Sequence, residues 1–162
     1  MQKILWADDE IEILQAHVLF LREKGYEVVT VTNGDDAVYQ VKNNQYDIVL
    51  VDEMMSGKDG LTTLNEIKDY SPQLPVIMIT KNEEESLMEE AIGKRIDDYL
   101  TKPVNPSQIL MACRKLLDKK DIITEKRSQQ YARELAQISA SLMKPLSAQD
   151  WIDYTLKFFR MD

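Results

Sequence analysis

Short aliphatic runs recur along the first 120 residues, and they constrain the fold more than any other feature. The runs 47–52 (DIVLVD) and 75–80 (PVIMIT) are apolar at almost every position. A strand with this pattern is covered on both faces, as in a parallel sheet packed between helices. Further strand patterns at 2–7, 26–32 and 98–101 alternate with helix patterns at 10–24, 35–43, 60–71, 83–95 and 105–119. Five strand–helix repeats predict an α/β fold with a doubly wound, five-stranded parallel sheet.

The charge of the chain is concentrated in this predicted domain. Residues 1–120 hold 22 acidic and 14 basic side chains, whereas residues 121–162 hold six of each. Because no basic face is present, nucleic acid is not an expected partner. No apolar run is long enough to span a membrane, and Asp8 and Asp9 come too early for a secretory signal. A cytoplasmic protein without membrane insertion is expected, and the lone Cys113 is expected to be a buried thiol.

Residues 121–162 predict a helical segment after the domain of residues 1–120. Neither glycine nor proline occurs from Ser107 to Lys144. An apolar seam with helical spacing is formed by Tyr131, Leu135, Ile138 and Leu142. After Pro145, Ser147 and Asp150 resemble a capping box for another amphipathic helix that contains Trp151, Phe158 and Phe159. Two such helices leave an apolar core incomplete, so we expect the start of a helical bundle from a longer protein.

Polar residues stand where the predicted strands end. Asp8 and Asp9 follow the first strand, and Asp52 ends the third. Thr80 ends the fourth strand and Lys102 follows the fifth. Since parallel strands place their carboxyl ends at one edge, where open α/β sheets bind ligands, these side chains are expected to meet.

The residue types in this set suit phosphoryl transfer with a divalent metal. Three clustered carboxylates require a counter-charge, and Mg²⁺ prefers carboxylate oxygens. A neutralised Asp52 carboxylate can then act as a nucleophile toward phosphorus. Lys102 and the Thr80 hydroxyl can bind phosphoryl oxygens. Taken singly, each residue also has an ordinary interpretation, such as a helix cap for Asp8 and Asp9 or a solvated lysine for Lys102.

This set resembles the receiver domain of two-component response regulators, and the resemblance covers residues 1–120. It implies the flavodoxin-like strand order 2-1-3-4-5 and phosphorylation of Asp52 by a sensor histidine kinase. It also implies that Asp9, Asp52 and the Met54 backbone carbonyl bind Mg²⁺, with Asp8 acting mainly through water. The same resemblance implies a cis peptide between Lys102 and Pro103.

The resemblance further assigns a switch and an output face. Tyr99 matches the aromatic residue that rotates inward when Thr80 moves toward the phosphoryl group. Phosphorylation is expected to promote a homodimer through the fourth helix, fifth strand and fifth helix. This face carries both signs of charge, on Glu89, Glu90, Lys94, Arg95, Asp97, Asp98, Arg114 and Lys115.

The chain departs from the receiver pattern in the loop after Asp52 and after Thr80. Ser56 stands where receivers usually carry proline, and Met54 replaces a commonly polar residue. Lys81 stands where many receivers have a small residue. These departures bear on the lifetime of the phosphoryl group, with a sign that the sequence does not give.

Three stretches are similar to PorX-type response regulators of type IX secretion. They are KILWADDEIEIL, MITKNEEESLMEEAIG and DWIDYTLKFF. In that family a helical bundle leads from the receiver to a C-terminal effector domain of the alkaline-phosphatase superfamily. The metal-binding residues of that domain do not occur in this sequence, so the resemblance implies no hydrolase activity here.

Two other functions fit the sequence less well. A phosphatase with an aspartate nucleophile needs a second acid two residues later, where this chain has Met54. A transcription factor needs a basic surface, whereas residues 121–162 are electrically neutral. A phosphorylation-controlled switch is the preferred interpretation.

Overall fold

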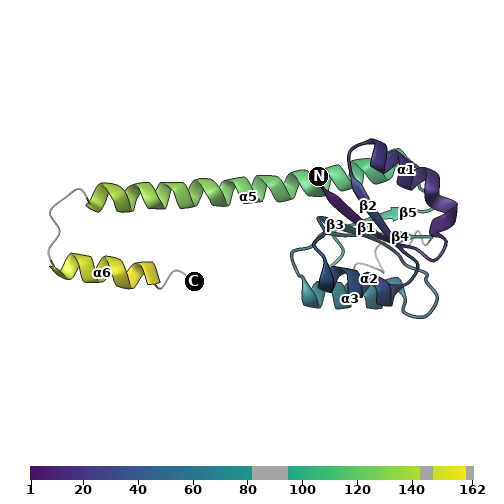
Figure 1. Ribbon diagram of the computed structural model, residues 1–162, viewed down its shortest axis with the longest axis horizontal. Helices are drawn as coiled ribbons and strands as arrows, with labels where there is room; N and C mark the ends of the chain where they lie inside the picture. The colour runs from purple at the N-terminus through teal and green to yellow at the C-terminus, as the bar shows by residue number, and fades with distance from the viewer. Residues whose placement is uncertain (82–94, 143–147, 160–162) are drawn as a thin grey trace. The chain divides into compact units, whose positions relative to one another are not determined.

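A five-stranded parallel sheet with the order β2-β1-β3-β4-β5 forms the centre of the fold (Figure 1). The computed structural model describes residues 1–81, 95–142 and 148–159. Its strands are β1 (Lys3–Ala7), β2 (Glu27–Val31), β3 (Ile48–Asp52), β4 (Val76–Thr80) and β5 (Asp98–Thr101). Its helices are the 3₁₀ turn η1 (Ile11–Leu14), α1 (Gln15–Glu23), α2 (Gly34–Asn43), α3 (Gly60–Tyr70), α5 (Pro106–Leu142) and α6 (Ala148–Phe159). The predicted fold class and strand order are confirmed.

Helices cover both faces of the sheet, which explains the continuous apolar runs. Every residue of β3 and β4 is buried. On one face, α1 and the first turns of α5 enclose a core that includes Ile4, Trp6 and Ile109. On the other face, α2 and α3 enclose a second core that includes Leu5 and Val49. Figure 1 shows α1 and α5 on one side of the sheet and α2 and α3 on the other.

Local signals fix where the helices begin and end. The Asn33 side chain accepts a hydrogen bond from the Asp36 N–H, so α2 begins at Gly34, one residue before its predicted start. Asp59 caps α3 in the same way through the Thr62 N–H. Gly25 follows α1 with a φ of +95°, the left-handed conformation that glycine commonly adopts after the end of a helix.

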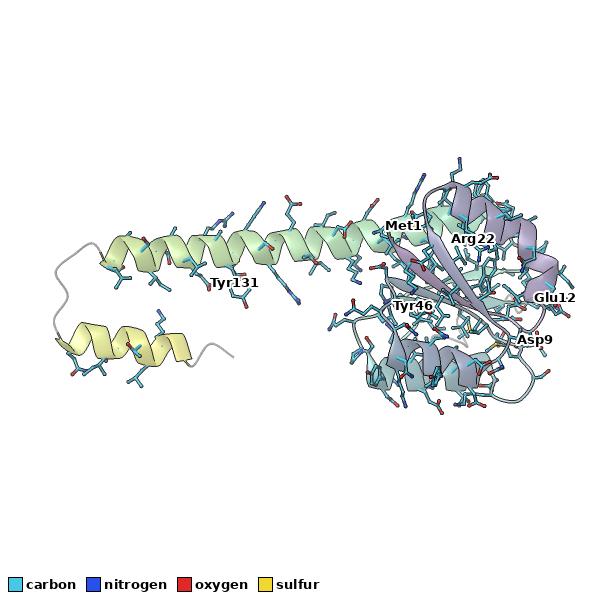
Figure 2. The ribbon with its side chains drawn as sticks, in the orientation of Figure 1. Met1, Asp9, Glu12, Arg22, Tyr46 and Tyr131 are labelled. Carbon is cyan, nitrogen blue, oxygen red and sulfur yellow. The ribbon has the colours of Figure 1, made fainter. Side chains whose placement is uncertain are left out.

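The predicted end of the fifth helix at Lys119 is wrong, because α5 continues to Leu142. The stretch contains no glycine or proline, so its backbone has no residue that favours a break. Two compact units divide the chain, Met1–Lys119 and Lys120–Asp162. In the second unit Tyr131 (labelled in Figure 2), Leu135 and Leu142 are exposed, so the predicted seam lies on the helix surface.

Two further predictions concern single residues and membrane insertion. Cys113 is fully buried, and burial raises the pKa of its thiol to about 12. Among the described residues, no helix has the length and apolar character that crossing a membrane requires. The predicted fourth helix and the capping residue Ser147 lie outside the described residues, apart from Arg95 at the end of that helix.

Candidate functional site

The predicted site residues meet at the carboxyl edge of the sheet. β1 is flanked by β2 and β3, so the chain reverses its direction of winding at this strand. This is the point at which open α/β sheets bind ligands. The loop after β1 carries Asp8 and Asp9, and β3 ends at Asp52. Thr80 is the last residue of β4, and Lys102 follows β5 directly.

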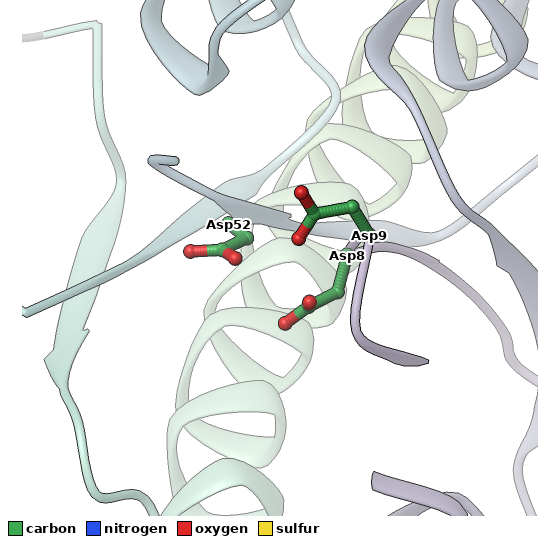
Figure 3. Close-up of side chains that lie close together, drawn as sticks. All are labelled: Asp8, Asp9 and Asp52. Atoms are coloured by element: carbon green, nitrogen blue, oxygen red, sulfur yellow. The ribbon is translucent and has the colours of Figure 1, made fainter. Parts of the chain in front are cut away.

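Three carboxylates lie close together at this edge (Figure 3). One oxygen from each of Asp8, Asp9 and Asp52 lies within 4.8 Å of the other two. Asp8 and Asp52 are buried, whereas Asp9 is exposed. The three acidic side chains that were expected to meet at this edge therefore do lie together.

Hydrogen bonds from nearby backbone orient two of these carboxylates. Asp8 Oδ1 accepts a hydrogen bond of 2.8 Å from the Glu10 N–H. Asp9 Oδ2 accepts hydrogen bonds from the Ser56 N–H at 3.3 Å and the Ser56 hydroxyl at 3.4 Å. A proline at position 56 would supply neither donor, so the departure from the receiver pattern has a structural consequence.

Lys102 supplies a positive charge at this acidic cluster. Its Nζ lies 3.0 Å from Asp52 Oδ2 and 3.7 Å from Asp8 Oδ2. The peptide bond between Lys102 and Pro103 is cis, the isomer that the resemblance implies. Burial alone would lower the pKa of Lys102, but the hydrogen bond to Asp52 and the charges of Asp52 and Asp8 raise it. Lys102 is therefore a cation in the site.

One ammonium group does not balance three carboxylates. Burial raises the pKa of Asp8, and the charges of Asp52 and Asp9 add to that increase. The Glu10 N–H and Lys102 oppose it. Among the described residues, Asp8 Oδ2 is a buried oxygen without a hydrogen-bond donor. A hard divalent cation fits this donor set, because its preferred ligands are carboxylate and carbonyl oxygens and water.

Thr80 contacts a residue that sequence reasoning did not single out. The Thr80 side chain is buried, and its hydroxyl donates a hydrogen bond to the Glu53 carboxylate. β3 and β4 pair Asp52 with Ile79, so the next residues, Glu53 and Thr80, are neighbours. This contact follows from the register of β3 against β4, which cannot be read from the sequence.

Ion pairs and a glycine fix the loop between β3 and α3. Lys58 forms ion pairs with Asp35 of α2, at 2.9 Å, and with Glu66 of α3. A Cβ atom at Gly60 would lie 2.4 Å from the Asp52 carbonyl oxygen, so only glycine fits there. Met54 donates its N–H to Asp52 Oδ1 at 3.4 Å, while its side chain is exposed.

The residues of the predicted output face differ in their environments. Arg95 donates hydrogen bonds to Asn65 and Asp69, and Asp97 accepts one from the buried Lys68. These two charges are therefore paired within the domain. Tyr99 is half-buried against the core that contains α2 and α3.

The remaining residues of this face are half-buried, exposed or outside the described residues. Asp98 accepts a hydrogen bond from the Tyr99 N–H, and Arg114 and Lys115 are exposed on α5. Glu89, Glu90 and Lys94 lie outside the described residues.

Comparison with known proteins identifies the family. The response regulator receiver domain family matches residues 4–114. A receiver domain protein from Clostridium thermocellum is 30% identical, with a TM-score of 0.68 over 76% of this chain and 99% of that chain. TrrA from Thermotoga maritima, solved in complex with Mg²⁺-BeF, is 29% identical, with a TM-score of 0.64 over 72% of this chain and 99% of that one.

A curated relative is longer than this chain. The transcriptional regulatory protein SrrA of Staphylococcus aureus is 29% identical over 133 residues, which are 82% of this chain and 55% of the relative. The chain thus spans about half the length of that protein. The family match over residues 4–114 contains Asp8, Asp9 and Asp52. By its fold and by the family match, the chain belongs to the response regulator receiver domains of two-component systems.

Proposed function

We propose that this domain is a switch controlled by phosphorylation of Asp52. The observation that carries the proposal is the position of the Asp52 carboxylate, buried between two further acids and 3.0 Å from the Lys102 ammonium. A carboxylate in this setting can accept a phosphoryl group once the surrounding negative charge is neutralised.

Mg²⁺ supplies that neutralisation when bound. Asp9, Asp52 and the Met54 backbone carbonyl would hold it directly, and Asp8 would hold it mainly through water. The Asp8 oxygen that lacks a hydrogen-bond donor suits a water molecule bound to a cation. Ser56 keeps the Asp9 carboxylate turned toward the site.

Each residue of the site then has its own role in the phosphoryl transfer. An Asp52 oxygen attacks phosphorus, the bond from phosphorus to the imidazole nitrogen of a sensor histidine kinase breaks, and the imidazole leaves with its electron pair. The product is an acyl phosphate on Asp52. Lys102 binds a phosphoryl oxygen as the charge develops, and the Thr80 hydroxyl donates to another.

Labelling with acetyl phosphate tests the assignment. Wild-type protein with Mg²⁺ is expected to gain one acid-labile, hydroxylamine-sensitive phosphoryl group, measured by intact mass. Asp52→Asn is expected to abolish labelling, because the amide is not a nucleophile, and chelation by EDTA should do the same. Asp118→Asn, at an exposed position of α5, serves as the matched control. Undiminished labelling of Asp52→Asn would reject the proposal.

The proposed output is a homodimer through β5, α5 and the segment between β4 and β5. Thr80 and Tyr99 border this face, so movement at the phosphoryl group reaches it first. The exposed Arg114 and Lys115 can pair with acids of a second copy across a two-fold axis. Arg95 and Asp97 already have partners within the domain, so we assign them a smaller part.

Sedimentation with BeF₃⁻ and Mg²⁺ tests the output. Exposed ion pairs contribute only about 0–1 kcal/mol each, so association should be weak and should depend on activation. Arg114→Glu is expected to prevent dimerisation while BeF₃⁻ still binds. Lys42→Glu, on α2 and outside this face, is the control. An Arg114→Glu variant that dimerises like the wild type would exclude this interface.

We further propose that the receiver acts in a cytoplasmic PorX-type regulator of type IX secretion, with a C-terminal effector domain in cis. The similar stretches at both ends of the sequence and the continuation of helix α5 beyond Lys119 support this assignment. Replacing Asp52 by alanine in the full-length protein of the host should lower secretion of type IX cargo, measured by immunoblotting of culture medium. Unchanged secretion would exclude a role in type IX secretion, but it would not exclude phosphorylation of Asp52.

A further inference from the structure

The backbone of Glu53 is fixed next to the end of β4. Its N–H donates to the Ile79 carbonyl at 2.8 Å, and its carbonyl accepts from the Gly60 N–H at 2.9 Å. A side chain at this position therefore lies beside Thr80, the residue after Ile79. The half-buried Glu53 carboxylate accepts the hydrogen bond from the Thr80 hydroxyl.

A threonine hydroxyl has one proton, so it donates to one strong acceptor at a time. In the proposed switch, the same proton must bind an oxygen of the phosphoryl group on Asp52. The Glu53 carboxylate and the phosphoryl oxygen are thus competing acceptors. Both are charged, so neither hydrogen bond is negligible.

We propose that Glu53 is a positioning residue that holds the Thr80 hydroxyl in the unphosphorylated arrangement. Phosphorylation must break this hydrogen bond before Thr80 can bind the phosphoryl group. Glu53 therefore weakens the hydrogen bond from Thr80 to the phosphoryl group. It also sets the fraction of phosphorylated molecules that adopt the switched arrangement. The inference rests on the proposed phosphorylation of Asp52 and adds a residue that controls its outcome.

Glu53 also carries a negative charge beside Asp52, and two substitutions separate the two effects. Glu53→Gln removes the charge but keeps an amide oxygen that can accept from Thr80. Glu53→Ala removes both the charge and the acceptor. The difference between these two variants therefore isolates the hydrogen bond. Glu12→Ala, at an exposed acid of η1, controls for loss of a surface charge.

The experiment is a titration of the full chain with BeF₃⁻ at constant Mg²⁺, followed by ¹⁹F NMR. BeF₃⁻ serves as the mimic of the phosphoryl group. Because a hydrogen bond to a charged group at a half-exposed site is worth about tenfold in an equilibrium constant, Glu53→Ala should bind about tenfold more tightly than the wild type. Glu53→Gln should bind BeF₃⁻ less tightly than Glu53→Ala, since its amide oxygen still competes for the Thr80 proton.

A Thr80→Val background completes the test. Without the hydroxyl, the difference between the alanine and glutamine variants at position 53 should disappear. Equal affinities of the two variants in the Thr80 protein would assign the effect to charge and overturn the inference. A difference that persists in Thr80→Val would overturn it as well, as would wild-type affinity in Glu53→Ala.

Failure of the proposed function gives a different result. If BeF₃⁻ binding to the wild-type protein does not depend on Asp52, the phosphorylation site itself is wrong. If binding depends on Asp52 but not on Glu53, only the role of Glu53 is rejected.

Discussion

Removing the charge of Asp8 is expected to stabilise the metal-free domain, although Asp8 lies in the proposed site. Its side chain is 0% exposed, and burial is the main reason that the pKa of this carboxyl is raised. Asp8→Asn keeps the size of the side chain and an oxygen for the Glu10 N–H. The substitution therefore removes the buried charge with little change in packing.

Pairwise charge interactions nearly cancel at Asp8. At an effective dielectric constant of about 20, the Asp52 carboxylate, within 4.8 Å, repels Asp8 by at least about 3.5 kcal/mol, and Lys102 at 3.7 Å attracts it by about 4.5 kcal/mol. The exposed Asp9 adds roughly 1 kcal/mol of screened repulsion. Because these interactions offset one another, the cost of burying the Asp8 charge decides whether Asp8→Asn stabilises or destabilises the domain. We expect a gain of about 1–3 kcal/mol in the free energy of unfolding for Asp8→Asn, the usual cost of a buried polar group without a hydrogen-bond donor, as at Asp8 Oδ2.

Urea denaturation in EDTA and in excess MgCl₂ measures this effect. In EDTA, Asp8→Asn should have the larger free energy of unfolding. Mg²⁺ binds the folded state and should stabilise the wild type more than it stabilises Asp8→Asn. The difference in the free energy of unfolding between the two proteins should therefore be smaller in MgCl₂ than in EDTA.

Asp9→Asn is the matched control. Asp9 is exposed, so its charge costs little, and the metal-free gain should stay below about 1 kcal/mol. As a direct ligand in the proposed site, Asp9 should nevertheless account for more of the stabilisation by Mg²⁺. An Asp8→Asn protein that is less stable than the wild type in EDTA would refute the reasoning, because burial of the charge would then carry no net cost.

Three further predictions concern packing and burial. Gly60→Ala should destabilise the domain by about 1–3 kcal/mol in urea denaturation, because the new Cβ meets the Asp52 carbonyl; wild-type stability would contradict this. The native Cys113 thiol should resist iodoacetamide at pH 8, far below its pKa of about 12, and react in urea; rapid labelling of the folded protein would contradict its burial. Lys68→Met should cost about 1–3 kcal/mol, less than a fully buried pair, because Asp97 is 34% exposed; a thermal melt equal to the wild type would show that the pair contributes nothing.

The two strands β3 and β4 were predictable from the sequence because each is a dense apolar run. The segment 47–52 becomes β3 over Ile48–Asp52, and 75–80 becomes β4 over Val76–Thr80. The half-exposed β5 was also placed at its correct bounds, 98–101, by its position in the alternation. The end of α5 was misplaced at Lys119, just after its last buried residue, Leu117, whereas the helix continues to Leu142 and the next proline is Pro145. Packing against the sheet stops well before the helix does.

Contacts between side chains were less accessible to sequence reasoning than the positions of the strand ends. The sequence gives no reason to expect that a helical lysine such as Lys68 is buried. In the structure its ammonium group donates hydrogen bonds to the Leu74 carbonyl and the Asp97 carboxylate. Lys58 likewise connects two helices whose separation the sequence does not give. These partners depend on the packing of whole elements.

The acidic cluster could be predicted from the sequence, whereas the Glu53–Thr80 contact could not, and this difference has a physical origin. Asp8, Asp9 and Asp52 meet because parallel strands have their carboxyl ends at one edge of the sheet, so the fold class alone brings these residues together. The bond between Glu53 and Thr80 requires one particular register of β3 against β4, because a shift of one residue would turn each side chain to the opposite face. Chemistry that depends on the fold class can therefore be inferred from sequence, whereas the residue that competes for the Thr80 proton requires the register that the structure provides.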